Sequence, residues 1–120
     1  MQGYRTLAPW LSPSGRFRPP YGKVNVGSWL AARRRGAPID WWTIDSGDTW
    51  AEPPAPESIA ERVVREHGGV VLLHDFDRDA DGAARADYVL RTVDMVTRRA
   101  SDAGLSFATI SELMEHDARG

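Results

Sequence analysis

The residues best suited to chemistry stand at the end of an apolar run. Val70 to Leu73 follow two glycines and lead directly into His74 and Asp75. A run of this kind is typical of a buried parallel strand, and in α/β folds the carboxyl ends of such strands usually carry the functional groups. The run therefore predicts that His74 is brought to a pocket. The alternative is a histidine satisfied at the rim of the core, and the run alone does not exclude it.

Two further clusters of polar and aromatic residues come earlier in the chain. Residues 17–22 read Phe-Arg-Pro-Pro-Tyr-Gly, and residues 45–50 read Asp-Ser-Gly-Asp-Thr-Trp. Both fall in loops or at strand ends, where functional groups tend to lie. Each also has a structural interpretation, because prolines and Gly22 suit a rigid turn, and Asp45 and Asp48 are common turn formers.

Hydrophobic periodicity predicts the elements that must position these clusters. A short strand is expected near 15–18, and strands are expected over 39–44, 70–73 and 106–110. Helices are expected over 25–35, 57–66, 86–103 and from Thr109 to about 116, where Thr109 and Glu112 fit a capping box. The acidic stretch 77–81 is expected to be a solvated loop. Strands and helices alternate from residue 39 onward, which predicts an α/β fold with a parallel sheet and right-handed crossovers.

Composition limits the classes of function. The chain has 120 residues, enough for one domain, and a net charge of −2, which favours neither nucleic acid nor an anionic membrane as partner. The absence of cysteine excludes disulfides and thiolate metal sites. We find no signal-type apolar segment and no run near the roughly 20 apolar residues of a membrane span, so the compartment stays undetermined.

Taken in order, the three clusters resemble the C-terminal half of the polysaccharide deacetylases, the NodB-homology group or carbohydrate esterase family 4. Arg18, Pro20 and Tyr21 match the family's motif Arg-x-Pro-Tyr. Asp45, Asp48 and, one residue late, Trp50 match its motif Asp-Ser-x-Asp-Trp. Leu72 and His74 match its motif Leu-x-His. Residues 104–113 resemble the closing strand and helix of the family. The resemblance covers about residues 10–115. It implies that residues 1–120 form a single partial domain, the C-terminal part of a distorted (β/α) barrel.

The resemblance implies metal-assisted hydrolysis of an N-acetyl or O-acetyl group on a polysaccharide such as chitin or peptidoglycan. It makes His74 the general acid that protonates the departing amine, and Asp45 the partner that holds its imidazole. It makes Arg18 the residue that orients the catalytic base, and the backbone N–H of Tyr21 an oxyanion donor. Substrate binding is assigned to Leu72, Trp50 and Pro20.

Two motifs of the family do not occur in this sequence. They are Thr-Phe-Asp-Asp-Gly, which supplies the base and one metal ligand, and His-Ser/Thr-x-x-His, which supplies two histidine ligands. The resemblance implies a divalent metal, most commonly zinc, but no residue of this chain is assigned as its ligand. We therefore expect the chain to be inactive alone, with a truncated reading frame as the favoured explanation. Its expected partners are a carbohydrate polymer and the missing N-terminal half of the domain, or a complementing chain.

A second function class stays open. An aromatic groove around Tyr21, Trp41, Trp42 and Trp50 could stack on sugar rings without hydrolysing them. The chain would then be a non-catalytic carbohydrate-binding or partner-dependent module.

Overall fold

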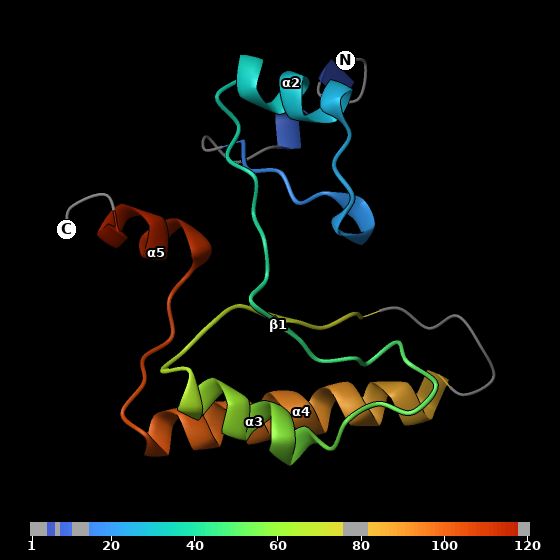
Figure 1. Cartoon of the computed structure of the whole chain (residues 1–120), viewed down its shortest axis with the longest axis vertical. Coiled ribbons are helices and arrows are strands. Elements are labelled where there is room, and N and C mark those ends of the chain that lie inside the picture. The colour runs from blue at the N-terminus through green and yellow to red at the C-terminus, as the bar shows by residue number, and fades with distance from the viewer. Residues whose placement is uncertain (1–4, 7, 11–14, 76–81, 118–120) are drawn as a thin grey trace. The chain divides into compact units, whose positions relative to one another are not determined.

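The computed structural model describes residues 5–6, 8–10, 15–75 and 82–117, so the predicted loop 77–81 lies outside the described residues. The chain divides into two compact units (Figure 1). The first comprises Met1–Trp41 and Ala108–Gly120, and the second is Trp42–Phe107. Each unit is described by itself below.

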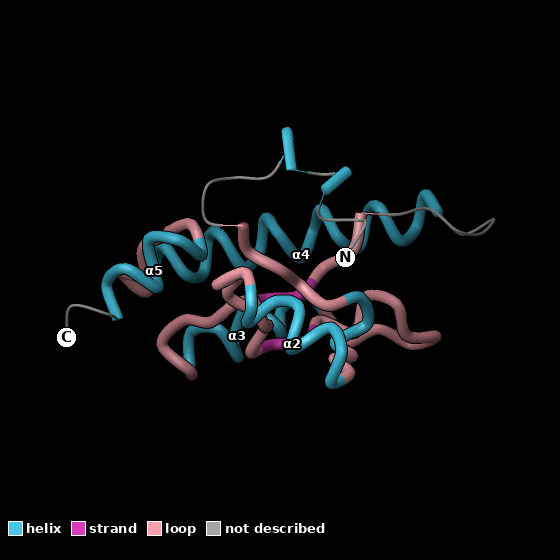
Figure 2. Tube along the Cα trace, turned by 90° about the horizontal axis from the view of Figure 1, so that it is seen from above, coloured by secondary structure: helices cyan, strands magenta, loops and turns pink. Residues whose placement is uncertain are grey.

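The second unit is built around a parallel strand pair. β1 (Ile44–Asp45) pairs with β2 (Val71–Leu72), with Ile44 opposite Val71 and Asp45 opposite Leu72. α3 (Pro56–Arg65) connects the two strands, and α4 (Gly82–Asp102) follows β2 (Figure 2). The predicted strand–helix–strand–helix order and the parallel pairing are therefore confirmed for this part of the chain.

The core of this unit lies where the strand pair meets the two helices. Its buried members are Ile44, Ile59, Val63 and Ala100, with Val71, Val96 and Leu105 packed against them. α3 and α4 contact each other along their length and run side by side in Figure 1. Ile59 and Val63 of α3 and Val96 and Ala100 of α4 therefore face one small core, as their spacing predicts, whereas Val93 of the same periodic set on α4 is exposed.

Gly69 lets the two strands approach closely. A Cβ atom at Gly69 would lie 2.7 Å from Thr43 Oγ1 and 3.1 Å from Ile44 Cδ1, and the residue has φ of +143°. The backbone N–H groups of Thr43 and Ile44 both donate to the Val70 carbonyl, at 2.9 and 3.1 Å. Of the two glycines that precede the apolar run, Gly69 is thus needed for the contact between β1 and β2, whereas a Cβ atom at Gly68 would meet no neighbour.

The first unit contains α2 (Val26–Arg34), α5 (Ile110–Asp117) and the 3₁₀ turns η1 (Ala8–Trp10) and η2 (Pro20–Gly22). Asn25 and Ser28 form a reciprocal capping box at the start of α2, and Gly36, with φ of +62°, follows its end. The predicted helix over 25–35 is therefore confirmed to within one residue at each end.

The strand predicted over 39–44 is mostly wrong. Of this segment only Ile44 enters β1, and Ile39 forms an isolated parallel bridge with Phe17. The strand expected near 15–18 is likewise reduced to this single bridge. The Arg16 guanidinium forms an ion pair with the Asp40 carboxylate beside this bridge. The β-branched and aromatic pattern of 39–44 is thus divided between the two units: the Asp40 N–H donates to the Phe17 carbonyl in the first, and the Thr43 N–H donates to the Val70 carbonyl in the second.

The strand predicted over 106–110 is also wrong, because Ile110 begins α5. The Thr109 N–H donates to Glu112 Oε2 at 2.6 Å, and the Glu112 N–H donates to Thr109 Oγ1 at 3.3 Å. This is the expected capping box, and it starts the helix at the point where the strand was predicted to end. The described residues hold one two-stranded sheet, and neither strand pairs with this segment.

The described part of the chain is therefore mixed α/β with a small parallel sheet. No helix within the described ranges is long and apolar enough to cross a membrane.

Candidate active site

The candidate site of the second unit forms beyond the carboxyl ends of β1 and β2. Because these strands are parallel, the residues that follow them emerge at the same edge of the sheet. Asp45 ends β1 and leads into residues 46–50, while Leu73 and His74 follow β2. The parallel pairing of β1 and β2 therefore brings two of the three clusters to one edge of the sheet.

The central contact is between Asp48 and His74. Asp48 Oδ1 lies 2.9 Å from His74 Nδ1, and the backbone N–H of His74 donates to Asp48 Oδ2 at 2.6 Å. The Asp48 side chain is 2% exposed and that of His74 is 36% exposed. A buried carboxylate thus engages one residue through both of its oxygens, which fixes the direction of the imidazole while leaving the ring partly open to solvent.

The loop that carries Asp48 is ordered by short-range hydrogen bonds. The Gly47 N–H donates to Asp45 Oδ1 at 2.9 Å, the Asp48 N–H to Ser46 Oγ at 3.3 Å, and the Trp50 N–H to the Gly47 carbonyl at 2.9 Å. The first two are the side-chain turns that Asp and Ser form with the backbone two residues ahead. The Asp-Ser-Gly-Asp sequence therefore folds back on itself and turns the Asp48 carboxylate inward.

No other residue can replace Gly47 in this loop unless the neighbouring atoms move. Its φ is +67°, and a Cβ atom there would lie 2.9 Å from both Pro54 Cδ and Trp50 Cδ2. Trp50 and Pro54 pack closely over the glycine, although the Trp50 side chain is otherwise exposed. The turn thus requires glycine for both its conformation and its packing.

The structure differs from the expectation about which aspartate holds His74. Asp48 makes the hydrogen bonds to His74, whereas the Asp45 carboxylate accepts the Gly47 N–H at the start of the loop. Asp48 was matched in the motif without a role. The signal for it in the sequence was the spacing, since a residue three positions beyond the strand end can fold back toward the next strand, and Asp45 is still part of β1.

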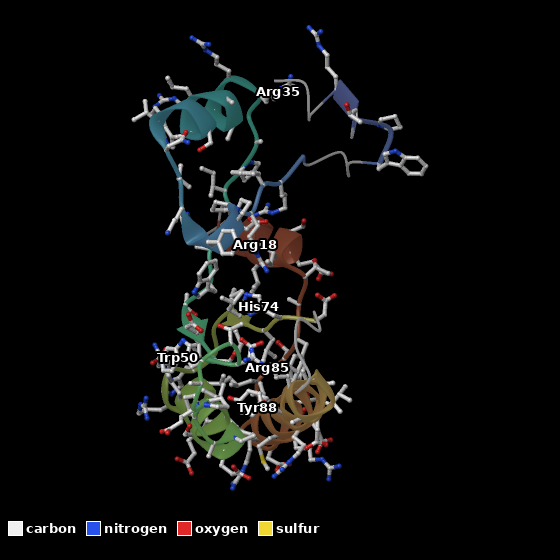
Figure 3. The ribbon with its side chains drawn as sticks, turned by 90° about the vertical axis from the view of Figure 1, so that its right-hand side faces the viewer. Arg18, Arg35, Trp50, His74, Arg85 and Tyr88 are labelled. Carbon is white, nitrogen blue, oxygen red and sulfur yellow. The ribbon has the colours of Figure 1, made fainter. Side chains whose placement is uncertain are left out.

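Leu72 and Trp50 belong to the same unit as His74. Leu72 is half-buried in β2 opposite Asp45, two residues before His74, and Trp50 is exposed on the Asp48 loop. Figure 3 labels Trp50 and His74 on their separate segments. The second unit therefore carries His74, Asp45, Leu72 and Trp50 of the predicted site residues.

Arg18, Pro20 and Tyr21 belong to the first unit. Pro19 is buried, and η2 is closed by hydrogen bonds from the Gly22 and Lys23 N–H groups to the Pro19 and Pro20 carbonyls at 3.2 and 3.1 Å. Tyr21 has φ of 55° and ψ of 19°, and the residue is 81% exposed. A left-handed conformation costs a non-glycine residue roughly 1–2 kcal/mol, so the turn holds Tyr21 in a strained backbone.

The described residues do not form a site for the divalent metal that the resemblance implies. Among residues 15–75 and 83–113, whose side chains the structure describes, no group of three or more His, Asp or Glu side chains could hold a metal ion. In the Asp48–His74 pair, His74 Nδ1 is used for the hydrogen bond with Asp48. The donors present here therefore do not fit that metal, and the chemistry these residues can supply is proton transfer by an oriented imidazole.

No family model matches the chain, and no solved structure matches it. Among curated proteins it is similar to the peptidoglycan-N-acetylglucosamine deacetylase of Bacillus cereus, with 30% identity over 120 residues. The aligned part is 97% of this chain and 53% of the relative, so the chain spans about half the length of the curated relative that it matches. This similarity suggests a relationship between the chain and the polysaccharide deacetylases.

Proposed function

We propose that this chain supplies the general-acid part of a polysaccharide deacetylase active site. The reaction is hydrolysis of an N-acetyl or O-acetyl group on a polymer such as chitin or peptidoglycan. The observation that carries the proposal is the buried Asp48 carboxylate bonded to His74 at the carboxyl edge of a parallel strand pair. The similarity to a bacterial peptidoglycan deacetylase supports the same class of reaction.

In this proposal His74 protonates the departing amine through Nε2. Asp48 accepts from Nδ1, so it keeps the ring in one tautomer and turns Nε2 toward the substrate. Leu72 would line the acetyl pocket and Trp50 would form part of its wall. From the first unit, Arg18 would orient the base, the Tyr21 N–H would bind the oxyanion, and Pro20 would contact the sugar.

The base and the metal ligands would come from residues outside these 120. The finer fold in this proposal is a distorted (β/α) barrel, of which β1 and β2 are part. A two-stranded parallel sheet has unpaired hydrogen-bonding groups along its outer edges, which further strands would satisfy. The complementing partner would be the remaining half of the same domain or a second chain.

The test of this function is a complemented protein. The chain would be co-expressed with the half of the Bacillus cereus relative that it does not match, and deacetylation of N-acetylglucosamine oligomers would be measured. We expect turnover in the complemented protein, and His74→Ala to lower kcat by about 10²–10⁴-fold with little change in KM. His67→Asn is the matched control, because His67 is exposed, has φ of 57°, and asparagine tolerates that conformation.

Unchanged kcat in His74→Ala would rule out the acid role. For the chain alone we expect neither stoichiometric zinc nor turnover, and either of these, measured by metal analysis and acetate release, would show that the chain holds a complete site.

The second candidate is a binding module that does not hydrolyse sugars. The exposed side chains of Trp50 and Tyr21 favour it, since exposed aromatic rings commonly stack on sugar faces. Binding of chitin oligomers to the complemented protein separates the two classes. If His74→Ala loses turnover but keeps binding, the chain is catalytic. If the parent and its variants bind the oligomers but none of them hydrolyses the acetyl group, the chain is a binding module.

A further inference from the structure

Tyr88 on α4 contacts both ends of the loop that carries Asp48. Its hydroxyl oxygen lies 3.1 Å from the Ser46 carbonyl and 2.9 Å from the Pro54 carbonyl. Tyr88 is labelled in Figure 3. A phenol has one proton, so the two carbonyls share a single donor. The residues between these carbonyls include Gly47, Asp48 and Trp50, which are the parts of the loop nearest the candidate site.

Apart from the two bonds between Asp48 and His74, the other hydrogen bonds of the described loop act over shorter spans. Those from the Gly47, Asp48 and Trp50 N–H groups each join residues two or three positions apart. They order successive residues but do not tie the loop to a rigid element. Tyr88 does, because it projects from α4, which packs along α3.

Tyr88 is itself held in place. Thr92, one turn further along α4, is fully buried, and its hydroxyl donates to the Tyr88 carbonyl at 2.8 Å. Burial of the Tyr88 hydroxyl raises its pKa above the ordinary value of tyrosine, and the charge of Asp48 acts in the same direction, whereas the Thr92 hydroxyl opposes them. The hydroxyl therefore stays a hydrogen-bond donor throughout the neutral range.

We propose that Tyr88 is a positioning residue for the acid: its hydroxyl joins the two ends of loop 46–54 and so sets Asp48 against His74. This role rests on the proposed function, because the step that Tyr88 would assist is the proton transfer by His74. Tyr88 acts through Asp48 and contacts backbone carbonyls rather than the imidazole. No family motif in the sequence pointed to this residue.

The test uses Tyr88→Phe in the whole chain, which removes the hydroxyl and keeps the ring. Two NMR readouts follow the Asp48–His74 contact without any substrate. They are the tautomer of the neutral His74 ring, from its ¹⁵N shifts, and hydrogen exchange of the His74 amide. In the parent chain we expect the Nδ1–H tautomer and a protected amide, because Asp48 accepts from both groups. In Tyr88→Phe we expect a shift toward the Nε2–H tautomer and exchange at least about tenfold faster.

Two further proteins make the result specific. Asp48→Asn provides the reference for a lost carboxylate, and Ala100→Gly weakens the same helix about 18 Å along its axis from Tyr88. If Ala100→Gly alters the readouts as much as Tyr88→Phe does, the effect is one of general stability and the proposal fails. It also fails if Tyr88→Phe leaves both readouts at parent values.

A fluorinated tyrosine at position 88 covers the case in which Tyr88→Phe does not fold. Its hydroxyl ionises at lower pH, so the donor can be removed within one folded sample by raising the pH. The His74 readouts should then change together with ionisation of the hydroxyl, and unchanged readouts across that ionisation would refute the role.

Activity separates this inference from the proposed function. In the complemented protein Tyr88→Phe should lower kcat and leave KM nearly unchanged. Altered NMR readouts without activity in any form would refute the deacetylase function and leave the positioning role intact. Parental kcat in Tyr88→Phe, in an active complemented protein, would refute the positioning role alone.

Discussion

At the scale of single residues, the candidate site depends on which of two aspartates faces the imidazole. Asp45 and Asp48 are three positions apart, yet one caps the turn and the other bonds to His74. The difference follows from burial. The Asp48 side chain is almost wholly enclosed, so it needs a donor for each oxygen, and His74 supplies both.

The two aspartates give a matched pair of variants. We expect Asp48→Asn to lower kcat of the complemented protein by about 10²–10⁴-fold. Asp48 accepts from the ring and from the backbone N–H of His74 with its two carboxylate oxygens, whereas the asparagine amide has one acceptor oxygen and an NH₂ group that can only donate. Asp45→Asn should have a much smaller effect, since the asparagine Oδ1 can still accept the Gly47 N–H. Steady-state deacetylation rates measure the difference. A larger loss in Asp45→Asn would return the role of imidazole partner to Asp45.

At the scale of elements, capping and glycines decide where helices begin and end. α2 begins at the Asn25 cap and α5 begins after Thr109, each with reciprocal hydrogen bonds between the cap and the third helical residue. These signals are local and could be predicted. Strand extent is not local, because a strand exists only where a partner supplies the ladder, and this is why the segments 39–43 and 106–110 were mispredicted.

The cap of α5 should make this helix sensitive to acid. The Thr109 N–H and hydroxyl bond to the Glu112 carboxylate and lower its pKa below the usual value of 4.5. Ionised Glu112 therefore stabilises the folded helix above that value, and the contribution is lost as the pH falls through the lower folded-state pKa. Backbone NMR shifts of α5 should report a loss of helix in this range.

Glu112→Gln is the control for this effect. Glutamine can still accept the Thr109 N–H but has no charge to lose, so α5 should respond little to pH between 5 and 3. An equal acid response in Glu112→Gln would show that the titration of another group is responsible.

At the scale of the whole molecule, the chain divides into two compact units. The apolar core of the second unit is small and centres on Ile44, which is fully buried between β2 and the helices. The first unit instead relies on short contacts such as the Phe17–Ile39 bridge and the Arg16–Asp40 ion pair. The candidate acid belongs to the unit with the apolar core.

Truncation of Ile44 should therefore act on one unit. We expect Ile44→Ala to destabilise the second unit by about 2–5 kcal/mol, because it removes buried methyl groups and leaves a cavity. Hydrogen exchange in α3 and α4 should rise accordingly, while exchange in α2 should change little. Ile39→Ala is the counterpart in the first unit, and equal loss of protection in both units in either variant would show that they unfold as one.

The sequence by itself determined the helices, their caps, the parallel order of β1 and β2, and the placement of His74 at a strand end. The helices, the caps and the strand end depend on residues close together in the chain, such as Asn25 with Ser28 or the apolar run before His74, and the parallel order follows from the alternation of strands and helices. It did not determine which aspartate meets His74, nor that Tyr88, 40 residues after Asp48, ties down the loop between Ser46 and Pro54. The first contact requires β1 and β2 to pair, and the second requires α4 to pack on α3. Both join groups distant in the chain, and no local pattern encodes such a contact.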